Sequence, residues 1–149
     1  MRILIDTNVY LDYLLTRDGV DDVINFFELT AKVNNQIYVT SMSIRDIGYV
    51  MHRKLHDEKL AKKAQELVYQ MSNKIIDITA DDTINSIYGE MKDFEDSLIS
   101  EAAEREMLDA IVTTNVKDFV GANIPVYSVS KMNSILSQQL KYQKSNNNL

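Results

Sequence analysis

Aspartates occur in four separate stretches of this chain, each near the end of a predicted strand or the start of a predicted helix. Asp6 follows the apolar residues 2–5, and Asp46 lies in the helix predicted after a second apolar stretch. Asp96 lies near the start of a later helix, and Asp118 follows a fourth apolar stretch. Carboxylates brought together repel one another unless cations neutralise them. The pattern therefore indicates a site that holds divalent metal, which in two-metal phosphodiesterases activates water and stabilises the leaving oxygen.

Each of these acids also has a simpler explanation. Asp6 can cap a helix, and Asp46 can pair with a neighbouring arginine. Acidic residues such as those at 93, 95 and 96 are routine in the first turn of a helix, because they complement the helix dipole. The stretch 115–118 can be an ordinary turn. The functional interpretation therefore depends on the coincidence of all four stretches.

The composition narrows the metal that such a site could hold. The chain has no cysteine, so disulfides and thiolate metal sites are excluded. Its two histidines, His52 and His56, lie beside a basic run, far in sequence from the acids. Oxygen ligands favour Mg²⁺ or Mn²⁺ over zinc. With four glycines there is little material for a glycine-rich phosphate loop, and nothing indicates a serine nucleophile.

Strand-like and helix-like stretches alternate along the chain, which is typical of a parallel sheet covered by helices. We predict strands at 2–5, 37–40, 74–78, 110–113 and 125–128. Helices are predicted at 8–15, from 20, from a cap at Ser41 or Ser43, at 60–71, around 84–91, at 93–106 and from 130. The predicted fold is a three-layer α/β/α sandwich with a central, mainly parallel five-stranded sheet. Ligands of such sheets bind beyond the carboxyl ends of the strands, where the acidic stretches fall.

Two helices have apolar residues at helical spacing and are expected to bury those faces. These are the face with Leu60, Ala64, Leu67, Val68 and Met71, and the face with Ile84, Ile87, Tyr88 and Met91. Tyr13, Phe26 and Tyr49 are compatible either with the core or with a dimer surface.

The length of 149 residues fits one domain, predicted at 1–142, followed by a polar and disordered tail at 143–149. The chain opens with no signal peptide and has no apolar run long enough to span a bilayer, so we expect a cytoplasmic protein without a membrane. Its net charge of −6 is unusual for a general nucleic-acid binder. Metal-binding carboxylates would account for part of that excess, so the charge does not exclude RNA.

Three stretches resemble the motifs of PIN domains, a family that includes the VapC toxins of toxin–antitoxin pairs. The first is Ile3-Leu4-Ile5-Asp6-Thr7-Asn8-Val9, and the second is Phe94-Glu95-Asp96-Ser97-Leu98-Ile99 followed by Ala102-Ala103. The third is Asp109-Ala110-Ile111-Val112-Thr113-Thr114-Asn115-Val116-Lys117-Asp118-Phe119. The order and spacing of these motifs extend over nearly the whole chain, as far as Ile124-Pro125-Val126-Tyr127.

The resemblance implies roles for particular residues. Asp6 and Asp96 would be the principal metal ligands. The second acidic position, usually glutamate, falls on the shorter Asp46. The fourth position is the uncharged Asn115, so Asp118 is expected to supply the remaining carboxylate. Thr7, Asn8 and Thr113 would support the aspartates.

The resemblance also implies an endoribonuclease that uses Mg²⁺ or Mn²⁺, has RNA as its substrate, is inhibited by an antitoxin protein and forms a homodimer. Phosphate contacts dominate nucleic-acid affinity, which makes cations near the acidic motifs candidates for binding RNA. Lys117 is the best candidate and Arg45 the second, although both could be ordinary surface residues.

Two alternatives remain open at this point. One is another Mg²⁺-dependent phosphohydrolase on a similar sheet. A haloacid-dehalogenase-like phosphatase needs an aspartate where this chain has Asn8, and a receiver domain needs one at the end of the third strand, whereas Asp77 lies inside it. The other is a PIN-like module that binds RNA or protein without catalysis, which the replacements at Asp46 and Asn115 allow.

Overall fold

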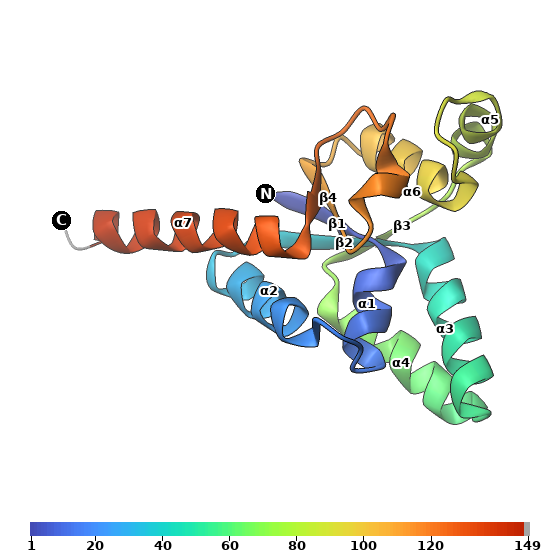
Figure 1. Cartoon of the computed structure of the whole chain (residues 1–149), viewed down its shortest axis with the longest axis horizontal. Helices are drawn as coiled ribbons and strands as arrows, with labels where there is room; N and C mark the ends of the chain where they lie inside the picture. The colour runs from blue at the N-terminus through green and yellow to red at the C-terminus, as the bar shows by residue number, and fades with distance from the viewer. Residues whose placement is uncertain (148–149) are drawn as a thin grey trace.

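The computed structural model describes residues 1–147, which build one five-stranded sheet with helices on both faces (Figure 1). The strands are β1 (Arg2–Ile5), β2 (Gln36–Thr40), β3 (Lys74–Ile76), β4 (Ala110–Thr113) and β5 (Val126–Ser128). Their order in the sheet is β3-β2-β1-β4-β5, and all four pairings are parallel. The predicted α/β/α sandwich is confirmed, with β1 at its centre.

Helices connect the strands as parallel pairing requires. They are α1 (Thr7–Leu14), α2 (Val20–Lys32), α3 (Ser41–Leu55), α4 (Glu58–Met71), α5 (Ala80–Tyr88), α6 (Phe94–Arg105) and α7 (Val129–Asn147), with the 3₁₀ turn η1 (Val116–Phe119) after β4. The cap of α3 is Thr40, whose side chain accepts from the backbone N–H of Ser43. Neither Ser41 nor Ser43 is the cap, because the helix already begins at Ser41.

Alternate residues of β1 face two different hydrophobic clusters. Ile3 and Ile5 belong to the larger one, which includes apolar residues of α1, α2, α3, α4 and α7. Leu4 belongs to the smaller one, built mainly by α6 and the segment around η1, with Phe119 as its aromatic member. This period-two alternation is the geometry of a strand buried on both faces.

The side chain of Gln65 on α4 fills the space beside Gly48 on α3. A Cβ on Gly48 would lie only 2.2 Å from Nε2 of Gln65, which donates to the Ile44 carbonyl. The buried residues of α4 are the small Ala61, Ala64 and Val68. The prediction that Leu60 and Leu67 are buried is wrong, since they are 44% and 36% exposed.

Helix α5 turns a polar face to the protein. Its buried residues are Asp82 and Ser86, whereas Ile84, Ile87 and Tyr88 are 51%, 60% and 84% exposed, contrary to the sequence-based expectation. Met91 lies beyond the end of the helix, which stops at Tyr88. The reason is an ion pair: Arg105 of α6 contacts Asp82 at 3.1 Å and also donates to the Asp77 carbonyl at 2.7 Å. A charged contact therefore decides which side of α5 faces inward.

The three aromatic residues left open between core and surface have different environments. Phe26 is completely buried, and its ring lies 5.2 Å from that of Phe27, so it belongs to the core. Tyr13 is partly buried against the same Phe27 ring at 5.7 Å. Tyr49 is 63% exposed.

The C-terminal helix α7 extends beyond the body of the protein (Figure 1). It continues to Asn147, so residues 143–147 of the predicted tail at 143–149 are helical in the structure, while 148–149 lie outside the described residues. Gln and Lys favour helix, and the Ser145 hydroxyl donates to the Lys141 carbonyl one turn back. Over residues 1–147, no helix combines the length and the apolar character that crossing a bilayer demands.

We expect Arg105→Ala to destabilise the fold by about 2 kcal/mol at pH 7, because it leaves the Asp82 carboxylate, 3% exposed, without its cation. Burial raises the pKa of Asp82, but hydrogen bonds from Arg105 and Thr79 outweigh it and hold the pKa below its ordinary value. The contribution of the pair is therefore present above the ordinary carboxylate pKa and is lost as the pH falls through the lowered one.

Urea unfolding of Arg105→Ala and the wild type at several pH values measures this difference. The matched control is Lys63→Ala, which changes an exposed cation on α4 that forms no ion pair within residues 1–147. An Arg105→Ala effect that persists unchanged at pH 2 would contradict the assignment.

Candidate active site

Asp6 occupies the point where the central strand ends. It follows β1 directly, is only 2% exposed, and its backbone N–H donates to the Val112 carbonyl of β4 at 3.0 Å. The Thr113 hydroxyl donates to Oδ2 of Asp6 at 2.8 Å and accepts from the Asn115 N–H at 3.0 Å. The ends of β1 and β4 are thus joined through one buried carboxylate.

A second polar chain joins the ends of β1 and β2. The Thr7 hydroxyl donates to Oγ of Ser43 at 2.9 Å, and the Ser43 and Thr40 hydroxyls lie 2.8 Å apart. Thr40 and Ser43 are completely buried. Each of these three hydroxyls has a hydrogen-bond partner within the network. The network therefore holds the start of α3, and with it Asp46, against the end of β1.

Four carboxylates from three elements line one cavity of about 160 Å³ beyond the carboxyl ends of the strands: Asp6, Asp46 on α3, and Glu95 and Asp96 in the first turn of α6. Thr7, Asn8, Leu11, Met42, Val50 and Ile99 complete its walls. The N-cap of α6 positions Asp96, because the Asp96 backbone N–H donates to the Asp93 carboxylate at 3.0 Å. Asp46 is 18% exposed and forms a hydrogen-bonded ion pair with Arg45.

The charges in this cavity perturb one another. Burial raises the pKa of Asp6, opposed by the Thr113 hydroxyl and the polar groups of Thr7 and Asn8. Burial, followed by repulsion from Asp6, Asp93, Asp118 and Glu95, raises the pKa of Asp96 to about 7. Such a cluster favours either a bound proton or a bound cation at neutral pH.

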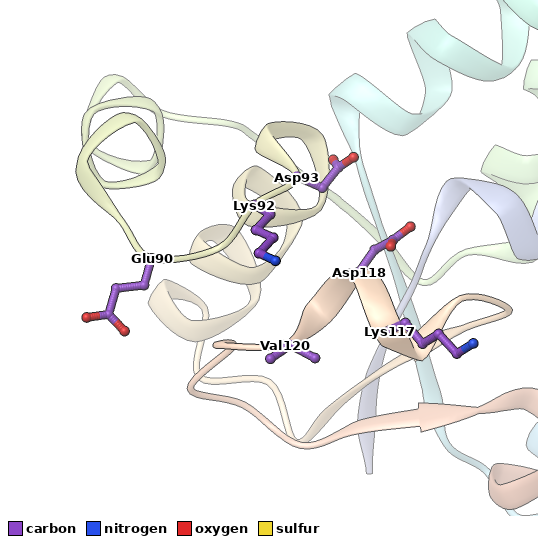
Figure 2. Close-up of a pocket in the computed structure, with 6 residues that line it drawn as sticks. All are labelled: Glu90, Lys92, Asp93, Lys117, Asp118 and Val120. Carbon is purple, nitrogen blue, oxygen red and sulfur yellow. The ribbon is translucent and has the colours of Figure 1, made fainter.

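Asp118 lies beside the cavity rather than in its wall. It comes from η1 and forms a hydrogen bond with the Asn115 side-chain amide. It lines a neighbouring groove of about 400 Å³, together with Glu90, Lys92, Asp93, Lys117 and Val120 (Figure 2). Because Asp118 and Asp93 both repel Asp96, the groove and the cavity form one electrostatic unit.

The structure thus brings Asp6, Asp46 and Asp96 together and places Asp118 next to them, while their chemical roles stay predictions. Arg45 contacts Asp46 but does not line the cavity, and Lys117 lines the neighbouring groove. The sequence did not single out Glu95 and Asp93, whose positions at a helix start have an equally good dipole explanation. It also did not indicate the hydroxyl pair Thr40 and Ser43, whose only signal is a polar residue directly after an apolar strand.

The donor set fits Mg²⁺ or Mn²⁺, because it consists of oxygen ligands whose mutual repulsion a cation would relieve. Within residues 1–147, no three acidic, histidine or cysteine side chains already surround one point as an ion would need. Two of the acids are engaged elsewhere, Asp46 by Arg45 and Asp118 by Asn115. Metal binding would therefore exchange these contacts for coordination.

The structure is an α/β domain with carboxylates gathered beyond the carboxyl ends of its strands, and comparison with protein families identifies the family of such a domain. The family model for the PIN domain matches residues 2–117. This chain belongs to the PIN-domain family, whose members are generally nucleases. A search of curated proteins gave no match.

Solved structures share the fold at low sequence identity. A crystal structure of VapBC2 from Rickettsia felis bound to a promoter DNA fragment matches with a TM-score of 0.68 and 23% identity, covering 86% of this chain and 98% of that one. VapBC from Salmonella typhimurium bound to DNA matches with 0.66 and 14%, covering 87% and 98%. FitAcB from Neisseria gonorrhoeae matches with 0.63 and 17%, covering 86% and 98%.

We expect Asp96→Asn to stabilise the metal-free protein by about 1–2 kcal/mol at pH 8, because it removes one of several repelling charges. An acid whose pKa is raised in the folded state destabilises the fold when it is ionised. The stabilisation by Asp96→Asn should therefore shrink as the pH falls from 7 to 4 and Asp96 of the wild type becomes protonated. Excess Mg²⁺ should raise the melting temperature of the wild type and not that of the variant.

Thermal unfolding with EDTA and with Mg²⁺ measures both effects. Glu104→Gln, an exposed acid at the other end of α6, is the control and should show neither. Equal Mg²⁺ stabilisation of wild type and Asp96→Asn would remove Asp96 from the ligand set.

Proposed function

We propose that this chain is a divalent-metal-dependent endoribonuclease and the toxin of a toxin–antitoxin pair. The observation that carries the nuclease proposal is the shared cavity of Asp6, Asp46 and Asp96 at the carboxyl edge of the sheet, in a chain of the PIN-domain family. The cavity has no serine, cysteine or histidine in its wall that could act as a nucleophile. Hydrolysis by an activated water is the chemistry that these carboxylates support.

In this proposal Asp6 and Asp96 hold Mg²⁺ or Mn²⁺, which when bound supplies a more acidic water and a positive charge for the phosphate. The Thr113 hydroxyl fixes the orientation of Asp6 through its 2.8 Å hydrogen bond. Asp46, one methylene shorter than glutamate, orients water at the edge of the cavity. Asp118, which accepts a hydrogen bond from the Asn115 side-chain amide, supplies a carboxylate at the side of the cavity that faces the groove.

The decisive experiment compares cleavage of a mixed single-stranded RNA by the wild type and by the Asp6→Asn, Asp96→Asn double variant. We expect Mg²⁺- or Mn²⁺-dependent cleavage by the wild type, inhibited by EDTA, and at least a 100-fold loss in the variant. That loss corresponds to about 3 kcal/mol of transition-state stabilisation.

Asp109→Asn is a matched control, because this carboxylate accepts from the Arg2 N–H at the opposite end of β1 and β4. Equal cleavage by wild type and double variant would reveal a contaminating nuclease. A pure and folded wild type without any metal-dependent cleavage would favour the alternative of a non-catalytic binding module.

The toxin proposal is supported by the VapBC and FitAB complexes among the structural neighbours. An antitoxin would insert a segment near the carboxylates, with an arginine or lysine meeting them. We expect expression of the wild type, but not of Asp6→Asn, Asp96→Asn, to arrest bacterial growth, and co-expression of a small neighbouring gene to restore it. Arrest by both proteins would contradict the proposal. The homodimer and the cytoplasmic location stay predictions.

A further inference from the structure

The groove beside the carboxylate cavity has two walls that are fixed to each other at the base. One wall is the loop between α5 and α6, with Lys92 and Asp93, and the other is η1, with Lys117 and Asp118. Gly121 has φ +100°, and a Cβ there would meet Met91 at 3.4 Å. Met91 in turn packs on the smaller hydrophobic cluster. The shape of the groove is therefore fixed by packing contacts between its two walls and the smaller hydrophobic cluster.

Within residues 1–147, the two lysines of this groove have no anionic partner. Lys92 and Lys117 each directly precede an aspartate, yet neither forms an ion pair in the part of the chain from residue 1 to 147. In the close-up, the ammonium groups of Lys92 and Lys117 lie to either side of Asp118, and the Lys117 side chain points away from Lys92 and Val120 (Figure 2). They are positioned to bind an anion from outside.

The same groove also has an apolar surface. Val120 lines it, and its side chain is 76% exposed. A volume of about 400 Å³ lies within the range of pockets that accept small organic ligands. A ligand with anionic groups and an apolar face between them matches this lining better than a simple ion does.

We propose that the groove is a nucleotide subsite, in which Lys92 and Lys117 bind phosphates of a single RNA strand on either side of Asp118, with a sugar or base against Val120. This inference rests on the proposed nuclease function, because the strand would continue from the carboxylate cavity into the groove. The negative charge of Glu90, Asp93 and Asp118 would otherwise repel the strand there, and the two lysines offset part of that repulsion.

The test measures binding of a fluorescent single-stranded RNA of mixed sequence to the full chain carrying Asp6→Asn and Asp96→Asn, without metal, at several salt concentrations. In that background, Lys92→Ala and Lys117→Ala should each weaken binding about fivefold to tenfold. Each should also reduce the slope of log K against log salt by about 0.7, the value for one phosphate contact on a single strand.

Lys59→Ala and Lys63→Ala, exposed lysines of α4 on the other face of the sheet, are the matched controls and should change neither quantity. Lys92→Arg should retain the affinity and the slope. Unchanged affinity and slope in both groove variants would overturn the proposal, as would absence of any RNA binding by the background variant. Metal-dependent cleavage by the wild type in either case would show that the nuclease function stands without this subsite.

Discussion

The buried carboxylate of Asp6 is the constraint around which the rest of the molecule is arranged. Strand β1 pairs with β2 on one side and β4 on the other, so its carboxyl end is the point at which the strand order changes direction. In open parallel sheets this point is where ligands bind. An ionised group with 2% exposure is costly there, and hydrogen bonding by one threonine hydroxyl offsets only part of the cost. A bound proton or a bound cation would relieve the rest of that cost.

The partners of Asp6 come from both layers of the sandwich. Helix α3, which carries Asp46, packs in the larger hydrophobic cluster, while α6 and η1, which carry Asp96 and Asp118, pack with the smaller one. The Thr40–Ser43–Thr7 hydroxyl chain fixes the first side, and the Asp93 cap together with the Asn115–Asp118 contact fixes the second. A cation bound between Asp6 and Asp96 would join the central strand to the smaller layer.

The strands and the site location could be predicted from the sequence, because both follow from short-range patterns. Residues 110–112 are apolar and are followed by the polar Thr113, and all four are buried in β4. The faces of α4 and α5 could not be predicted in this way. On α4 the small residues Ala61, Ala64 and Val68 are buried while Leu60 and Leu67 are exposed, and on α5 the Arg105–Asp82 pair turns the polar face inward. Both depend on contacts between residues distant in sequence, as do the roles of Thr40 and Glu95 in the site.

The close approach at Gly48 has an evolutionary consequence. The residue lies two positions after Asp46, and the Gln65 amide that fills the space above it also holds the Ile44 carbonyl two positions before. A larger residue at 48 would displace that amide from the Ile44 carbonyl, because the end of the flexible Gln65 side chain would have to rotate away. Residues 48 and 65 are therefore expected to vary together in descendants of this sequence, although neither one borders the cavity.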